Sequence, residues 1–131
     1  MGELEFSDKF LRGYRNGEPV FEEGSVGEHA YVILSGRIDI VRKTRDGETL
    51  VRTLGKGEIF GEMALVDQLP RSASAVSRAD DTSLVAINHA YFVYLVGQQP
   101  AFALILLKAM SLRLRAQMAK ESAAAGKGAS S

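Results

Sequence analysis

The sequence lacks cysteine, an excess of charge of either sign, and any apolar run of membrane-spanning length. Without cysteine there is neither a disulfide framework nor a thiolate site, which fits a reducing compartment, and we expect a cytoplasmic protein. Sixteen basic residues balance sixteen acidic ones, so the electrostatic signature of a nucleic-acid-binding domain is missing. The longest apolar run, 101–107, is far too short to cross a bilayer, and the amino terminus lacks the apolar core of a signal peptide. We therefore expect no membrane segment.

Histidine is scarce as well. The two histidines, His29 and His89, lie far apart in the sequence and have no carboxylate or cysteine at ligand spacing, so no metal site and no cofactor are predicted. An enzyme on a small barrel, as in the cupins, needs a histidine cluster at a metal or a nucleophile paired with a base. The sequence supplies neither, so we expect no catalytic residues and no enzyme.

Short strand-like segments punctuated by glycine occupy the first two thirds of the chain. At 131 residues there is room for one domain with its own core. The apolar segment 31–34 reads as a buried strand, and Asp46-Gly47 is a strong hairpin signal between 38–40 and the returning strand 50–54. The last strand is expected at 84–87. Roughly eight short strands at this spacing are typical of a jelly roll or a compact barrel.

Two helices are expected after the strands. Asn88 is a suitable N-cap for a helix that Gly97 and Pro100 terminate, and a longer helix follows from residue 101 to about Lys120. The small, polar tail that comes next, 121–131, is expected to be disordered.

The long helix carries two apolar stripes, although a solvent-exposed terminal helix needs only one. The second stripe therefore requires another partner, either a ligand or a second copy of the chain. A homodimer through this helix is our hypothesis. The first stripe consists of Phe102, Ile105, Leu106, Ala109 and Leu112, and the second of Leu107, Met110, Leu114 and Met118.

The segment 60–74, FGEMALVDQLPRSAS, supplies what a small protein needs to hold one compact organic phosphate. Gly61 lets the backbone approach a ligand closely, and the helical turn that follows directs the free N–H groups of Ala64 and Leu65 at an anion. Arg71 offers two oxygens of the same phosphate a planar fork of donors, which a lysine does not. The segment therefore predicts a phosphate site.

Two further side chains indicate a sugar beside the phosphate. Ser72 adds a hydroxyl that can donate to the phosphate or to a base edge. Glu62 is not expected to face the phosphate, because two anions in contact repel, so it should accept a hydrogen bond from a ribose 2′-hydroxyl. Phosphate and ribose together specify a nucleotide.

The same segment resembles the phosphate-binding cassette of the cyclic nucleotide-binding domain family, which includes the catabolite activator protein, kinase regulatory subunits and cyclic-nucleotide-gated channels. The cassette pattern, F-G-E-x-A-L, a short insert, then R-[ST/A]-A, is matched at every position. Upstream segments such as 31–36 and 54–58 match too, so the resemblance spans about residues 10–118. The ligand-binding residues taken from it are Gly61, Glu62, Met63, Ala64, Arg71, Ser72 and Ala73.

The resemblance implies a mainly β fold with flanking helices. The expected architecture is a double-stranded β-helix, or jelly-roll-like β-roll, over about 14–88, followed by C-terminal helices over about 89–120. A single cyclic nucleotide-binding domain is thus expected at 1–120, ahead of the tail at 121–131.

The resemblance also implies roles for individual residues. Glu62 would bind the ribose 2′-hydroxyl and Arg71 the cyclic phosphate, with main-chain amides near Ala64 completing the site. In this family the final helix moves when the ligand binds and often caps the base. Here the capping residues are expected among Leu114, Arg115 and Met118.

The predicted function is a cyclic nucleotide receptor that signals to a partner protein or an attached domain, whose identity the sequence does not give. The ligand is expected to be cAMP, with cGMP as the alternative. A ligand-free interaction module of the same fold competes with this interpretation, but a buried arginine without its anion is costly, so Arg71 argues against it. No helix-turn-helix is expected after the long helix, which excludes DNA binding by that route.

Three charged residues receive structural interpretations. Glu58 matches a family position, but we expect it to stabilise the fold. Arg113 and Arg115 are expected on a solvated helix face, and the alternative is that one of them reaches the base.

Overall fold

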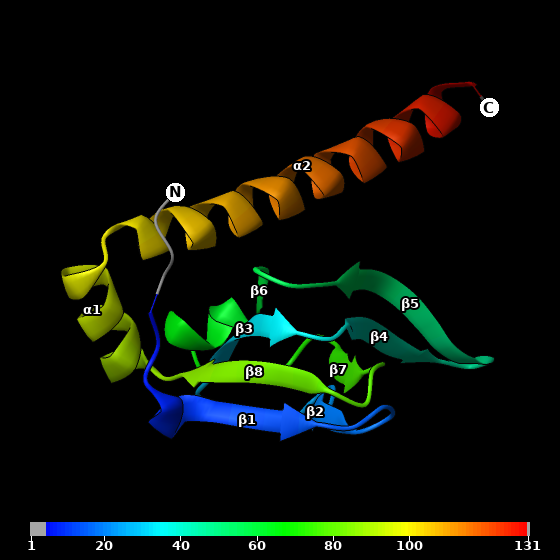
Figure 1. Ribbon diagram of the computed structural model, residues 1–131. Coiled ribbons are helices and arrows are strands. Elements are labelled where there is room, and N and C mark those ends of the chain that lie inside the picture. The colour runs from blue at the N-terminus through cyan, green and yellow to red at the C-terminus, as the bar shows by residue number, and fades with distance from the viewer. Residues whose placement is uncertain (1–4, 131) are drawn as a thin grey trace.

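The computed structural model of the protein describes the backbone of residues 5–130 and the side chains of residues 5–123. Eight strands and two short 3₁₀ helices precede two α-helices (Figure 1). The elements are η1 (Asp8–Phe10), β1 (Leu11–Tyr14), β2 (Pro19–Phe21), β3 (Ala30–Ser35), β4 (Ile38–Thr44), β5 (Gly47–Leu54), β6 (Ile59–Phe60), η2 (Glu62–Leu65), β7 (Ser74–Ser77), β8 (Thr82–Ile87), α1 (His89–Gln98) and α2 (Ala101–Ser130).

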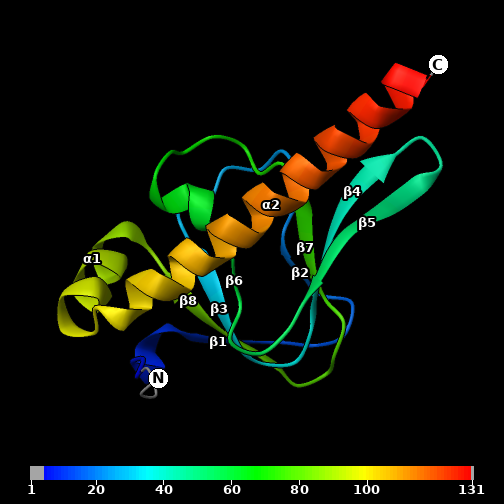
Figure 2. The ribbon, with the colours of Figure 1, turned by 90° about the horizontal axis from the view of Figure 1, so that it is seen from above.

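The strands form two four-stranded sheets in which every pairing is antiparallel. One sheet has the order β1-β8-β3-β6 and the other the order β2-β7-β4-β5. The sheets face each other as a β-roll, and the helices cover the first sheet (Figures 1 and 2). The predicted jelly-roll-like β-roll followed by C-terminal helices is confirmed.

Strand β3 is buried on both faces and links the two halves of the core. Tyr31 and Ile33 pack in the cluster between the sheets, whereas Ala30 and Val32 pack in the cluster beneath the helices. Successive side chains of a strand point to opposite faces, so one apolar strand serves both clusters. β8 alternates in the same way, and this central pair of strands therefore couples the interior of the roll to the helices.

The roll begins earlier than predicted. β1 starts at Leu11, whereas the sequence placed the start of the roll at about residue 14. Only Tyr14 of this strand is not exposed, so β1 has no buried apolar alternation to reveal it. Its pairing with the edge of β8 determines its structure.

Helix α1 starts where the sequence indicated. The Asn88 side chain accepts a hydrogen bond from the Tyr91 N–H, which confirms the predicted N-cap. No single described helix is long and apolar enough to cross a bilayer; only α1 and Ala101–Ala123 together, bent by 120°, meet the requirement of length and composition.

Helix α2 is longer than predicted. It continues to Ser130, through most of the segment for which a disordered tail, 121–131, was expected, while residue 131 lies outside the described residues. Three consecutive alanines, 123–125, follow the expected end near Lys120. Alanine has the highest helix propensity, which favours helix over 123–125, whereas Gly126 and Gly128 disfavour it and leave the last turn without a local reason.

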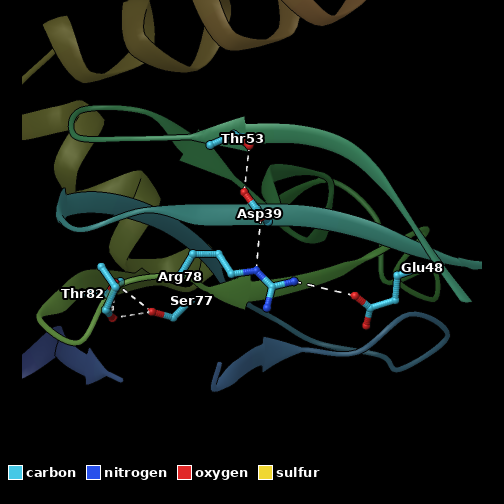
Figure 3. A network of polar contacts seen from close by, with 7 residues as sticks. Asp39, Glu48, Thr53, Ser77, Arg78 and Thr82 are labelled. Atoms are coloured by element: carbon cyan, nitrogen blue, oxygen red, sulfur yellow. Dashed lines mark hydrogen bonds and ion pairs between the residues drawn. The ribbon is translucent and has the colours of Figure 1, made fainter. Parts of the chain in front are cut away.

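A polar network closes the end of the second sheet (Figure 3). Arg78 contacts Asp39 at 3.1 Å and Glu48 at 3.6 Å, and Asp39 accepts a hydrogen bond from Thr53. The buried Ser77 hydroxyl donates to the Thr82 hydroxyl at 2.8 Å. Thr82 also lies against Gly36 in the β3–β4 turn, where the glycine leaves no room for a methyl group.

Replacing Gly36 by alanine is expected to destabilise the fold more than replacing Gly17. Both glycines have a φ of 90°, so both variants carry the cost of a left-handed residue, about 1–2 kcal/mol. Only at Gly36 would the new methyl group collide with a neighbour, the Thr82 Cα at 2.6 Å, which adds about 1–3 kcal/mol. Urea unfolding of the two variants measures the difference, and equal losses would contradict the packing of Gly36 against Thr82.

Candidate functional site

A cavity of about 320 Å³ opens between η2, the start of β7 and α2. All seven residues predicted to bind the ligand line this cavity: Gly61, Glu62, Met63, Ala64, Arg71, Ser72 and Ala73. The other lining residues come from strands, the cassette loop and α2, and they are Phe21, Ile40, Arg52, Phe60, Asp67, Leu69, Pro70 and Arg113. The central segment of the sequence therefore forms one wall of a single site.

The turn from β6 into η2 requires glycine. Gly61 has a φ of 70°, in the left-handed region, and it caps the N-terminus of η2. A Cβ at this position would lie 2.9 Å from Arg71 Nη1 and 3.2 Å from the Phe21 ring. The bare backbone thus leaves space for the arginine, which enters from the other end of the cassette.

The guanidinium of Arg71 is held by main-chain carbonyls. Its Nη1 donates to the Gly61 carbonyl at 3.1 Å and its Nη2 to the His29 carbonyl at 2.8 Å. The guanidinium carbon lies 4.1 Å from the centre of the Phe21 ring, a cation–π contact. Burial lowers the pKa of Arg71 from its usual value. Its buried Nε has no hydrogen-bond partner among the described residues and remains a donor for a ligand.

The backbone of Arg71 is fixed as well. Its N–H donates to the Ser25 carbonyl at 2.7 Å, and its carbonyl accepts from the Gly24 N–H at 2.8 Å. A Cβ on Gly27 would lie 2.5 Å from Arg71 Nη2, so Gly27 also keeps space for the guanidinium. The connection between β2 and β3 was not predicted from the sequence to be part of the site. The signal that could have identified it is Gly27, the second glycine of this connection after Gly24.

Glu62 is the most deeply buried charged residue of the site, with 2% of its surface exposed. Its Oε1 forms an ion pair with Nη1 of Arg113, a residue of α2. Its Oε2 has no hydrogen-bond partner among the described residues. The carboxylate therefore has one oxygen on the helix and one oxygen available as an acceptor.

The charges around the cavity favour an anion. Arg52, Arg71 and Arg113 line it together with two carboxylates, Glu62 and Asp67, which leaves an excess of one positive charge. Burial, and then the charge of Arg113, lower the pKa of the half-buried Arg52. The chain is neutral as a whole, so this positive excess is local.

The amides expected to face an anion are not the ones that the structure leaves available. Ala64 N–H donates to the Gly61 carbonyl at 3.2 Å within the 3₁₀ turn, whereas the sequence predicted free N–H groups on Ala64 and Leu65. A 3₁₀ turn leaves its first N–H groups without partners in the turn, which here are those of Glu62 and Met63. The N–H groups without partners in the turn thus lie nearer the N-terminus of η2 than predicted.

The capping of a base by α2 stays a prediction, although the three residues predicted for it lie away from the cavity. Leu114, Arg115 and Met118 are exposed and do not line the cavity, and Arg113 is the α2 residue that does. Arg113, expected on a solvated face, is 35% exposed, and its pairing with the buried Glu62 was not predicted. The helical repeat could have identified Arg113 as a residue that faces the roll. It follows the packed residues Leu106 and Ala109 by seven and four positions, and residues at this spacing lie on the same face of a helix.

The remaining candidates have structural contacts. Glu58 accepts a hydrogen bond from the Gly55 N–H at 3.3 Å, in agreement with a structural role. His89 Nδ1 lies 3.2 Å from the Leu65 carbonyl and so connects η2 to α1. Burial lowers the pKa of His29, whose ring lies near Tyr31. Within residues 5–130 no three histidine or acidic side chains are placed to hold a metal ion.

Comparison with protein families matches residues 11–99 to the cyclic nucleotide-binding domain. Among curated relatives, the cyclic AMP receptor protein of Thermus thermophilus is 38% identical over 105 residues, which are 79% of this chain and 48% of that protein. The chain thus spans about half the length of this relative.

Solved structures agree with the sequence comparison. The catabolite activator protein of Thermus thermophilus superposes with a TM-score of 0.76 and 34% identity, over 88% of this chain and 54% of that one. The EAL enzyme Bd1971 matches in a cAMP-bound form, with a TM-score of 0.60 and 30% identity over 86% of this chain and 30% of that one. Its cGMP-bound form matches with a TM-score of 0.60 and 31% identity, over 84% and 29% of the two chains.

Proposed function

The chain belongs to the cyclic nucleotide-binding domain family, and from that premise we propose that it is a receptor for cAMP. The observation that carries this proposal is the pairing, in one cavity, of a fixed arginine with a buried carboxylate. Arg71 presents an unpartnered Nε to an anion, and Glu62 presents an unpartnered Oε2 to a hydroxyl. A ribose 3′,5′-cyclic phosphate carries both an anionic phosphate and a 2′-hydroxyl on one compact pair of fused rings.

Each ligand group has a matching protein group in this proposal. The phosphate binds Arg71 and the first N–H groups of η2, where the positive end of the turn adds to the attraction. The ribose 2′-hydroxyl donates to Glu62. The hydroxyl of Ser72, which is exposed and lines the cavity, donates to the phosphate or to the base. The name of one relative, a cyclic AMP receptor protein, supports cAMP as the ligand, whereas the EAL enzyme Bd1971 matches in both a cAMP-bound and a cGMP-bound form.

We propose a sensor and not an enzyme. The lining of the cavity includes no histidine, cysteine or lysine, and among the described residues Ser72 makes no hydrogen bond to either carboxylate of the cavity, Glu62 or Asp67. A nucleophile paired with a base is therefore not formed there. The output is instead a movement of the helices. η2 contacts α1 through His89 and α2 through Glu62, so a ligand on η2 acts on both.

One observation favours the alternative ligand, cGMP. Arg52 lines the cavity from β5, and its side chain makes no hydrogen bond or ion pair with any described residue. A guanidinium can bind the O6 and N7 acceptors of guanine with two hydrogen bonds, whereas adenine offers N7 alone. The nucleotide titration therefore includes both ligands.

Calorimetric titration with cAMP, cGMP and 5′-AMP tests the proposed function. We expect cAMP to bind more tightly than 5′-AMP by at least about tenfold, because the site matches a cyclic monoanion. Tighter binding of cGMP than of cAMP would make cGMP the proposed ligand, with Arg52 as its guanine contact. Weak, equal binding of all three would contradict the cyclic-phosphate assignment, and no binding would favour a ligand-free module.

Arg71→Ala is expected to weaken cyclic nucleotide binding by about 2–5 kcal/mol, the cost of deleting one partner of a buried charged pair. Glu62→Gln should cost less, because an amide oxygen still accepts from the ribose. Arg42→Ala is the matched control, since it removes the same charge from an exposed position of β4. Near-wild-type affinity of folded Arg71→Ala would show that Arg71 does not bind the phosphate.

We further propose that the second stripe of α2 forms a homodimer. Leu107, Leu114 and Met118 are 57–60% exposed and Met110 is 40% exposed, so the single chain leaves this stripe without a partner. Sedimentation should show a dimer that Leu114→Glu dissociates. Leu112→Glu, on the other side of the helix and equally exposed, is the control. A wild-type monomer with and without ligand would contradict the dimer.

A further inference from the structure

Asp67 lines the cavity but has no part in the contacts proposed above for the nucleotide. It lies in the loop between η2 and β7, four positions before Arg71, and it is partly buried. A carboxylate in a site for an anion repels the ligand, and the repulsion grows in proportion to the charge that the ligand carries. Asp67 therefore opposes the binding of some anions more than that of others.

The position of Asp67 in the wall of the cavity is fixed by two hydrogen bonds. Its N–H donates to the Met63 carbonyl at 2.9 Å, and its Oδ1 accepts from the Leu69 N–H at 3.4 Å. The side chain thus closes a turn of its own loop. Within residues 5–123 no lysine, arginine or histidine forms an ion pair with it. Its negative charge is therefore not neutralised by a cation in contact with it.

The charges of the cavity match a ligand with a single negative charge. Glu62 and Arg113 balance each other in their ion pair. Arg52, Arg71 and Asp67 remain, and they sum to one positive charge. A cyclic phosphate is a diester with one negative charge, so its binding brings the sum to zero. A phosphate monoester such as 5′-AMP carries about 1.5 to 2 negative charges at pH 7 and leaves the cavity with a negative excess.

We propose that Asp67 determines the selectivity of the cavity for a singly charged phosphate: it leaves room for a cyclic phosphodiester in the charge balance and repels phosphate monoesters and longer phosphate chains. This inference rests on the proposed function and deepens it, because it assigns the rejection of acyclic nucleotides to one residue. Arg71 attracts every phosphate, so it does not make this distinction by itself. The partial burial of Asp67 keeps its charge from being fully screened by solvent and salt.

A purely structural role of Asp67 predicts a different result. Asparagine has the same shape and also offers an oxygen to the Leu69 N–H, so it preserves the turn. If Asp67 only closes the turn, Asp67→Asn leaves the affinity for every nucleotide unchanged. If Asp67 acts by its charge, the free energy gained on removing that charge is about twice as large for a dianion as for a monoanion. The increase in affinity for the dianion is then about the square of the increase for the monoanion.

Asp67→Asn is expected to bind cAMP about threefold and 5′-AMP about tenfold more tightly than the wild type does, in calorimetric titration at about pH 7. The preference for cAMP over 5′-AMP then falls about threefold. Asp46→Asn is the matched control, because it removes the same charge from an exposed turn in which Asn-Gly is as suitable as Asp-Gly. It should leave both affinities unchanged. No gain for Asp67→Asn, or an equal gain for cAMP and 5′-AMP, would overturn the selectivity role.

A third ligand separates the charge of the phosphate from its shape. Adenosine 5′-(methyl phosphate) is acyclic like 5′-AMP but carries a single negative charge like cAMP. Its affinity should therefore rise on Asp67→Asn by about the same factor as that of cAMP. A rise as large as that of 5′-AMP would show that Asp67 rejects the open phosphate by shape, which would overturn selection by charge.

The two hypotheses fail in different ways. If the wild-type chain binds cAMP but Asp67→Asn keeps the wild-type preference over 5′-AMP, the selectivity role is wrong and the proposed function stands. If the wild-type chain binds no cyclic nucleotide, the proposed function fails, and the selectivity role fails with it. If the wild-type chain prefers cGMP, the same comparison is made with cGMP and 5′-GMP, because the phosphate groups are identical.

Discussion

The position of the Arg71 guanidinium is the constraint on which the site depends. Its partners come from both sheets: the His29 and Gly61 carbonyls adjoin β3 and β6 of one sheet, and Phe21 belongs to β2 of the other. Two glycines, Gly27 and Gly61, leave the space in which this side chain lies. A cation held on two sides by carbonyls and on a third by a ring has few other orientations, so the position of its unpartnered Nε is fixed as well.

The same contacts revise one argument made from the sequence. A buried arginine was expected to be costly without its anion, which weighed against a ligand-free module. In the structure two of the three guanidinium nitrogens already have main-chain acceptors, and only Nε is unpartnered. The cost of an empty site is therefore reduced, and the unpartnered Oε2 of Glu62 becomes an equally strong argument for a ligand.

The cassette and the β-roll were predictable because their signals are local. The segment 60–74 is contiguous, and the hairpin between β4 and β5 turns at Asp46-Gly47 as predicted. Asn88 caps α1 by accepting a hydrogen bond from a residue three positions away. Strand β1 escaped prediction because its pairing with β8 joins residues about seventy positions apart, and its exposed side chains show no alternation. Arg113 was misplaced for a related reason: its partner lies fifty-one positions earlier, and only the direction in which α2 crosses the roll brings the two together (Figure 2).

Glu62 connects ligand and helix because of its burial. A carboxylate with 2% of its surface exposed needs a donor in every state of the protein, since a buried charge without a partner costs several kcal/mol, on the order of 3–5. Arg113 is that donor, and it belongs to α2. Its guanidinium pairs with Oε1 of Glu62, whereas Oε2 has no hydrogen-bond partner among the described residues. One buried side chain thus joins the cavity to α2 directly, with no chain of intermediate residues between them.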